Sequence, residues 1–225
     1  MQDKVVVVTG AFGALGRVVA AEAAARGAKV AALDYAPAAP DGLVAALASP
    51  GVDLTAPDGA ASAIAAVADR FGRIDALINI AGGFVWQTVG DGDAATWQRM
   101  YAMNVATTLN ACKAALPHLV ASQGRIVNIG ANAALKADAG MGAYAASKSG
   151  VHRLTEALAA EYKGKVAVNA VLPSIIDTPA NRADMPDADA SKWVTPQDLA
   201  AVILFLASDA ARAVTGALVP VTGGV

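Results

Sequence analysis

The chain has 225 residues and a net charge of −2, and it carries no basic block that would attract a polyanion, so we expect no nucleic-acid partner. Hydrophobic residues make up 56% of the chain, enough for a large core, yet no apolar run approaches the roughly 18 residues of a membrane span, so we expect no membrane partner. A single cysteine, Cys112, and two histidines are too few for a disulfide or a Cys/His metal site, so we expect no metal and a cytoplasmic location.

Short apolar runs alternate with longer helical patterns along the chain. The β-branched run at 4–9 is typical of a strand buried on both faces, and Gly27 is a suitable end for the helix after it. Thr195 and Pro196 are typical of the N-cap and first position of a helix. We expect strands at 4–9, 29–34, 51–54, within 74–83, at 124–130, 165–173 and 217–224, and helices at 13–27, 57–72, about 93–122, from the region of Tyr144 to about 161, and at 195–209.

This alternation predicts a parallel sheet covered by helices on both faces. Because crossovers between parallel strands are right-handed, the expected fold is α/β: a doubly wound Rossmann fold with a seven-stranded parallel sheet. No linker divides the sequence, so we expect a single domain over residues 1–225. The long irregular segment at about 178–195 predicts a loop over the substrate.

A glycine-rich turn, "TGAFGALG", joins the first predicted strand to the first helix. Gly10, Gly13 and Gly16 allow a tight turn and close approach of the backbone. The helix that follows offers free N–H groups and the positive end of its dipole to a pyrophosphate. The context favours nucleotide binding, and the alternative is a tight turn without a ligand.

Two aspartates follow the next two predicted strands. Asp34 ends the second strand, where a carboxylate can accept hydrogen bonds from the adenine ribose and would repel a 2′-phosphate. We therefore expect NAD(H) to be favoured over NADP(H), the alternative being a loop aspartate that faces water. Asp53 could reach the adenine amino group or could serve only a turn.

The stretch "GAYAASKSG" places Tyr144 and Lys148 four residues apart, on one face of the predicted helix. A phenol beside an ammonium group is a plausible proton donor. The pair alone is equally compatible with a surface helix.

Five motifs occur in the order found in the short-chain dehydrogenase/reductase family, and together they cover nearly the whole chain. They are "TGAFGALG", "NIAG", "MNV", "YAASK" and "PSIIDTP". The chain resembles that family, and the resemblance implies an NAD(H)-dependent oxidoreductase that moves hydride between nicotinamide and a small substrate. Tyr144 would then be the general acid or base, with its pKa lowered by roughly 1–3 units beside the Lys148 ammonium.

The resemblance also implies roles for other residues. Lys148 would hold the nicotinamide ribose, and Asn104 would anchor a water that relays protons to Lys148. The expected cofactor contacts come from the glycine turn, the segment after the fourth strand and the segment after the sixth: Gly10, Phe12, Gly13, Ala14, Leu15, Gly16, Asn79, Ala81, Gly82, Pro173, Ile176 and Thr178.

Two features depart from the usual pattern of the family. The glycines are spaced as in its extended group, although the chain is too short for that group's extra domain. Ala131 stands at the usual position of the catalytic serine, and the neighbouring Asn132 could replace its hydrogen-bond donor. Both departures resemble the quinonoid dihydropteridine reductase branch of the family, as does the segment 177–196, whereas Asn104 keeps the more common pattern.

These observations leave three classes of function. The first is an oxidoreductase acting on an ordinary ketone, alcohol or quinone, or on a pterin-like quinonoid compound. The second is a dinucleotide-binding sensor without catalysis, and the absence of a serine at position 131 favours it. The third is a structural protein. In each case the alanine-rich helices favour a homodimer or homotetramer.

Overall fold

The computed structural model describes residues 1–224, and its centre is one sheet of seven parallel strands. The strand order is β3-β2-β1-β4-β5-β6-β7, so the chain winds outward from β1 in one direction and then from β4 in the other. The prediction of a doubly wound, seven-stranded parallel sheet is confirmed. The strands are β1 (Val5–Thr9), β2 (Lys29–Leu33), β3 (Leu47–Ser49), β4 (Ala76–Asn79), β5 (Arg125–Ile129), β6 (Ala167–Pro173) and β7 (Leu218–Val221).

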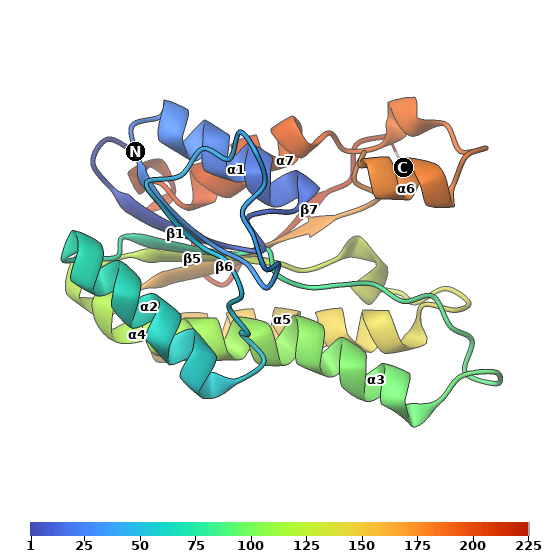
Figure 1. Ribbon diagram of the computed structural model, residues 1–225. Coiled ribbons are helices and arrows are strands. Elements are labelled where there is room, and N and C mark those ends of the chain that lie inside the picture. Colours follow the sequence, from blue (N-terminus) through green and yellow to red (C-terminus); the bar gives the residue numbers. More distant parts are fainter. Residues whose placement is uncertain (225) are drawn as a thin grey trace.

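Helices cover both faces of this sheet, with α1 and α7 above it and α2, α4 and α5 below it in Figure 1. Within residues 1–224, no helix is long and apolar enough to cross a membrane. The α-helices are α1 (Ala14–Ala25), α2 (Pro57–Phe71), α3 (Ala94–Tyr101), α4 (Thr107–Ser122), α5 (Gly142–Glu161), α6 (Pro179–Asp184) and α7 (Pro196–Leu206).

The core consists of two apolar layers, one on each face of the sheet. In β1, Val6 and Val8 face the layer under α1 and α7, whereas Val5 and Val7 face the layer with α2, α4 and α5. All four valines are buried, as expected for a parallel strand covered on both sides. Because all the strands are parallel, their carboxyl ends lie along one edge of the sheet. The direction in which the chain adds strands reverses between β1 and β4.

The third strand lies earlier in the sequence than expected. The prediction of a strand at 51–54 was wrong, because β3 occupies Leu47–Ser49 and pairs with β2. Gly51 has φ +70°, and Val52 donates its N–H to the Asp34 carbonyl, so the backbone turns away from the sheet after Pro50. The small side chains around β3 hide the alternation that would have marked an edge strand.

The long helix expected at about 93–122 exists, but its middle is wound differently. A π-helical turn, Ala102–Ala106, separates α3 from α4. Two hydroxyls bond back to carbonyls of this turn: Thr107 Oγ1 donates to the Met103 carbonyl at 2.7 Å, and Thr108 Oγ1 to the Asn104 carbonyl at 2.8 Å. Such single wider turns are frequent at functional sites, and this one carries Asn104.

Candidate active site

The glycine turn between β1 and α1 forms a close-fitting cradle at the carboxyl edge of the sheet. Gly10 has φ +64°, and a Cβ there would lie 2.7 Å from the Ala81 nitrogen. A Cβ on Gly16 would overlap the Gly10 carbonyl oxygen. The N-cap of α1 is Gly13, so no side chain competes for the first N–H groups of the helix. The turn therefore fits the pyrophosphate of a dinucleotide.

The other predicted residues of this turn differ in what they can offer. Phe12 is half-buried, Ala14 is exposed, and Leu15 is buried in the core beneath α1. The Leu15 side chain belongs to the core, so a contact with a cofactor would come from its backbone.

Asp34 closes the turn from the end of β2. Its Oδ2 accepts the N–H of Phe12 and its Oδ1 accepts the N–H of Ala36, both at 2.9 Å. A carboxylate has about four lone-pair sites, so further hydrogen bonds to a ribose are compatible with this arrangement. Asp53 is engaged locally, because its Oδ1 accepts both the N–H and the hydroxyl of Thr55, and these bonds lower the pKa of its carboxyl.

Asn79 ends β4 and points its side chain into the sheet. Its Nδ2 donates to Asn128 Oδ1 at 2.9 Å, and Asn128 in turn donates to the Thr155 hydroxyl on α5 at 2.9 Å. Asn79 Oδ1 is buried and has no hydrogen-bond partner among the described residues. The side chain thus ties two strands to a helix, and the contact with a cofactor expected of Asn79 would fall to its backbone.

Asn104 fixes the segment that follows β4. Its side chain accepts the N–H of Gly83 and donates to the Gly83 carbonyl, both at 3.0 Å. The same amide donates to Ser147 Oγ at 3.0 Å, and Ser147 donates to the Tyr144 carbonyl at 2.7 Å. Sequence reasoning missed Ser147, although it stands next to Lys148 in "YAASK". The wider helical turn at Asn104 therefore links the β4 loop to the first turns of α5.

Tyr144, Lys148, Asn104 and Gly82 lie close together in the structure. Lys148 Nζ lies 6.0 Å from the centre of the Tyr144 ring and donates to the Ile129 carbonyl at 2.8 Å. A Cβ on Gly82 would lie 2.5 Å from Asn104 Oδ1 and 3.6 Å from Lys148 Nζ, so the two polar groups flank this glycine.

The protonation of the pair differs from the expectation. Burial raises the pKa of Tyr144 to about 12 and lowers the pKa of Lys148 to about 8. The expected lowering of the Tyr144 pKa was wrong in direction, because the loss of water around the phenol disfavours its charged form. Tyr144 is therefore a neutral phenol at pH 7, able to donate a proton.

Ala131, at the position of the missing serine, is buried beside a histidine that sequence reasoning left without a role. The Ala131 N–H donates to His152 Nε2 at 3.3 Å, and His152 is only 2% exposed. Burial, followed by the charges of Arg153 and Lys148, lowers the pKa of His152 to about 4, so the ring is neutral and accepts this bond. Asn132 begins a short 3₁₀ turn and is half-buried.

The predicted residues Pro173, Ile176 and Thr178 occupy the end of β6 and the segment that leads from it into α6. Pro173 is buried at the end of β6, Ile176 forms a bridge with Val194, and Thr178 caps α6 by accepting the Asn181 N–H at 3.2 Å. The segment 178–195 is less irregular than expected, because it contains α6 and a 3₁₀ turn at 190–192. Trp193, in the same segment, is buried.

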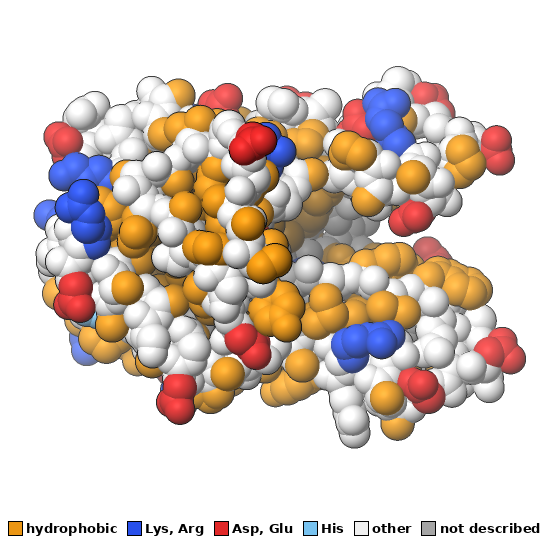
Figure 2. Space-filling view, viewed as in Figure 1, with side chains coloured by type: hydrophobic (Ala, Val, Ile, Leu, Met, Phe, Trp, Pro, Cys, Tyr) orange, Lys and Arg blue, Asp and Glu red, His pale blue; other side chains and the backbone are white. Residues whose placement is uncertain are grey.

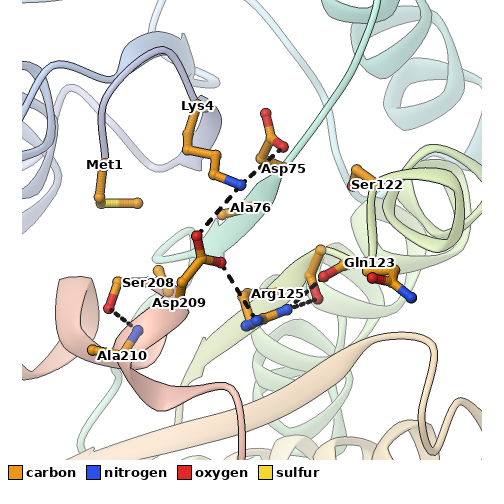
Figure 3. Close-up of a pocket in the computed structure, with 12 residues that line it drawn as sticks. Met1, Lys4, Asp75, Ala76, Ser122, Gln123, Arg125, Ser208, Asp209 and Ala210 are labelled. Atoms are coloured by element: carbon orange, nitrogen blue, oxygen red, sulfur yellow. Dashed lines mark hydrogen bonds and ion pairs between the residues drawn. The ribbon is translucent and has the colours of Figure 1, made fainter.

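A cavity of about 280 Å³ lies at the other edge of the sheet, near the amino ends of the strands (Figure 3). Lys4 approaches Asp75 at 3.8 Å and Asp209 at 3.6 Å, and Arg125 approaches Asp209 at 3.6 Å. These ion pairs connect β1, β4 and β5 to the end of α7, so the cavity is distinct from the cradle and from Tyr144.

Known proteins resemble this chain over its whole length. A sequence model of the family described as short chain dehydrogenase matches residues 4–189. The 2-(S)-hydroxypropyl-CoM dehydrogenase 3 of Xanthobacter autotrophicus is 34% identical, with 100% of this chain and 97% of that protein covered. The meso-2,3-butanediol dehydrogenase of Serratia marcescens is also 34% identical, with 99% and 94% covered.

The resemblance extends to solved structures. Carveol dehydrogenase from Mycobacterium avium, solved in complex with NAD, superimposes with a TM-score of 0.88 at 26% identity, covering 100% of this chain and 98% of that one. These three proteins are all named as dehydrogenases, and they give no support to the dihydropteridine reductase branch.

Proposed function

The chain belongs to the short-chain dehydrogenase family and is an oxidoreductase, and we propose that it transfers hydride between NAD(H) and a small carbonyl or alcohol compound. The observation that carries the proposal is the meeting of two features at one edge of the sheet. The glycine cradle fits a pyrophosphate. Tyr144 and Lys148 lie beside Gly82, which belongs to the loop after the neighbouring strand β4.

In this proposal a bound nicotinamide supplies or accepts the hydride. Tyr144 donates its phenolic proton to the substrate oxygen during reduction and takes it back during oxidation. Lys148, held by the Ile129 carbonyl, provides the nearby positive charge. Asn104 fixes the position of Gly83 relative to α5 through its hydrogen bonds to Gly83 and Ser147. A water at Asn104 that relays protons to Lys148 belongs to the same proposal.

The preference for NAD(H) over NADP(H) rests on Asp34. Its carboxylate already receives two backbone N–H groups at the turn, which fixes a negative charge beside the expected ribose. We propose that this charge repels a 2′-phosphate.

Relatives suggest the substrate class. The butanediol and carveol dehydrogenases are named after small uncharged alcohols, which favours such a substrate here. A pterin-like quinonoid substrate remains an alternative, motivated by Ala131. A dinucleotide sensor without catalysis is the second alternative. The hydrogen bonds that link Asn104 through Ser147 to Tyr144 argue against it, because a sensor needs no positioned proton donor.

Two further parts of the proposal concern assembly and location. We propose a homodimer or homotetramer, because Trp97 and Tyr101 stay exposed beside Ala146 around a shallow cavity of about 390 Å³. A cytoplasmic location, without a nucleic-acid or membrane partner, also remains a proposal. We likewise propose that residues 1–225 form a single domain and that the segment at about 178–195 is its substrate loop.

The test combines binding with turnover. NADH and NADPH are titrated by fluorescence, and reduction of butane-2,3-dione is followed with each, for the wild type and for Asp34→Ser. We expect NADH-dependent reduction by the wild type and a shift toward NADPH in Asp34→Ser. NADH binding without turnover of any ketone, alcohol or quinonoid pterin would favour the sensor instead.

A further inference from the structure

Phe84 stands directly beside the proposed proton donor. Its ring meets the Tyr144 ring edge to face, with the ring centres 5.0 Å apart and the planes at 87°. The residue before it, Gly83, is held at its N–H and its carbonyl by Asn104. Although it is fixed in this way, Phe84 remains 51% exposed. One side of the ring packs on Tyr144, and much of the rest is open to a ligand.

Trp86 follows two residues later in the same loop. Its indole lies across Gly140, where a Cβ would overlap the ring and where φ is +76°. The N–H of Gln87 donates to the Gly140 carbonyl at 2.9 Å, which ties the loop after β4 to the loop before α5. Trp86 is nevertheless 60% exposed. Both rings are therefore held in place before any ligand arrives.

These two residues, which we call the aromatic wall, lie in the loop between β4 and α3, which runs below α6 in Figure 1. Figure 2 shows a cleft opening between the part of the molecule that carries α6 and the loops below it, with hydrophobic side chains along the lower edge. The wall offers exposed, uncharged ring surface from Phe84 and Trp86, and Phe84 brings it against the Tyr144 ring.

We propose that the substrate of this site carries its reacting carbonyl or hydroxyl group on a flat, uncharged ring that lies against the aromatic wall. The inference rests on the proposed function and narrows its substrate class. A flat ring covers exposed aromatic surface efficiently, and aromatic pairs gain from offset or edge-to-face contact. A linear polyol would instead place its hydroxyl groups against the aromatic rings, which offer few hydrogen bonds. Those hydroxyls would lose their hydrogen bonds to water and gain no others.

The test compares a ring ketone with an open-chain ketone. The kcat/KM values for NADH-dependent reduction of α-tetralone and of butane-2,3-dione are measured for the wild type, Phe84→Leu and Trp86→Leu. Phe205→Leu, which changes an exposed aromatic residue on α7, is the matched control. We expect the wild type to prefer α-tetralone. The ratio of the two kcat/KM values should fall about tenfold in both wall variants, mainly through the KM for α-tetralone, and should not change in the control.

The outcomes separate this inference from the function beneath it. Efficient reduction of butane-2,3-dione alone, or a ratio unchanged in both wall variants, would overturn the inference while leaving the oxidoreductase intact. Dissociation of the assembly by both wall variants in light scattering would identify the wall as an interface and would also overturn it. If the wild type reduces no ketone and oxidises no alcohol with bound nicotinamide, the proposed function fails and the inference fails with it.

Discussion

At the scale of single residues, burial decides the protonation of the site. Tyr144, Lys148 and His152 follow one another at intervals of four along α5, against the end of β5. Burial pushes each toward its neutral form, with pKa values of about 12, 8 and 4. At pH 7 the phenol and the imidazole are therefore neutral, and Lys148 keeps its charge between them.

The depressed pKa of His152 predicts a loss of stability in acid. The unfolded chain takes up a proton at His152 as the pH falls below 6.5, whereas the folded chain resists until about pH 4. Because the unfolded state binds more protons in this window, stability falls as the pH falls through it. From pH 7 to 4.5, we expect the wild type to lose roughly 1–3 kcal/mol more than His152→Gln, measured by urea unfolding. Equal losses in the two proteins would show that His152 does not titrate in this way.

Residue spacing predicted that Tyr144 and Lys148 lie together, but it did not predict how deeply they are buried. The interval between Tyr144 and Lys148 correctly placed both on one face of a helix, yet it could not show that the helix is packed against β5. Contacts between distant parts of the chain were also missed. Ser147 meets Asn104 from 43 positions away, and Phe84, which follows the glycine held by Asn104, meets Tyr144.

At the scale of elements, the junction of β1 with α1 is built with almost no free space. Gly10 approaches Ala81, Gly16 approaches Gly10, and Asp34 closes the turn from β2. The sequence predicted this junction well because glycine spacing, a strand before it and a helix after it are all local signals. It predicted β3 poorly, since this edge strand has only three residues and its partly exposed side chains form no strong pattern.

The close fit at Gly16 gives a prediction for cofactor binding. A Cβ there would press on the Gly10 carbonyl and on the backbone of Ala11, neither of which can move without opening the turn. We expect Gly16→Ala to weaken NADH binding at least about tenfold and to destabilise the fold by roughly 1–3 kcal/mol. Fluorescence titration with NADH and urea unfolding measure the two effects.

The control for this prediction is Gly164→Ala. Unlike Gly16, Gly164 has open space where a Cβ would be added, although its φ of +77° makes the substitution strained. It should therefore lower stability by about 1 kcal/mol without changing NADH affinity. NADH binding by Gly16→Ala at the wild-type level would contradict the proposed position of the pyrophosphate.

At the scale of the whole molecule, the parallel sheet separates two edges with different tasks. The carboxyl edge carries the cradle, Tyr144 and the aromatic wall, where the strand order reverses between β1 and β4. The amino edge is held by ion pairs of Lys4, Asp75 and Asp209. The alternation of strands and helices was enough to predict the parallel sheet that has these two edges, because the sheet is a property of topology rather than of any one contact.

The exposed face of α3 and α5 leads to a prediction about assembly. Trp97 and Tyr101 leave apolar surface open beside Ala146, and a second copy of the chain could cover it. Light scattering at micromolar concentration should give the mass of two or four chains. Ala146→Arg should reduce that mass, whereas Val44→Arg, at an exposed apolar residue elsewhere, should not. A wild-type mass of one chain would contradict the prediction.

The measurement that tests the central claim most directly is the reduction of a small ketone by Tyr144→Phe beside its affinity for NADH. The variant keeps the ring that packs against Phe84 but removes the proton that the phenol would donate. We predict that NADH still binds and that kcat/KM falls at least about 100-fold. Turnover at the wild-type level in Tyr144→Phe would contradict the account, because the proton would then come from another group.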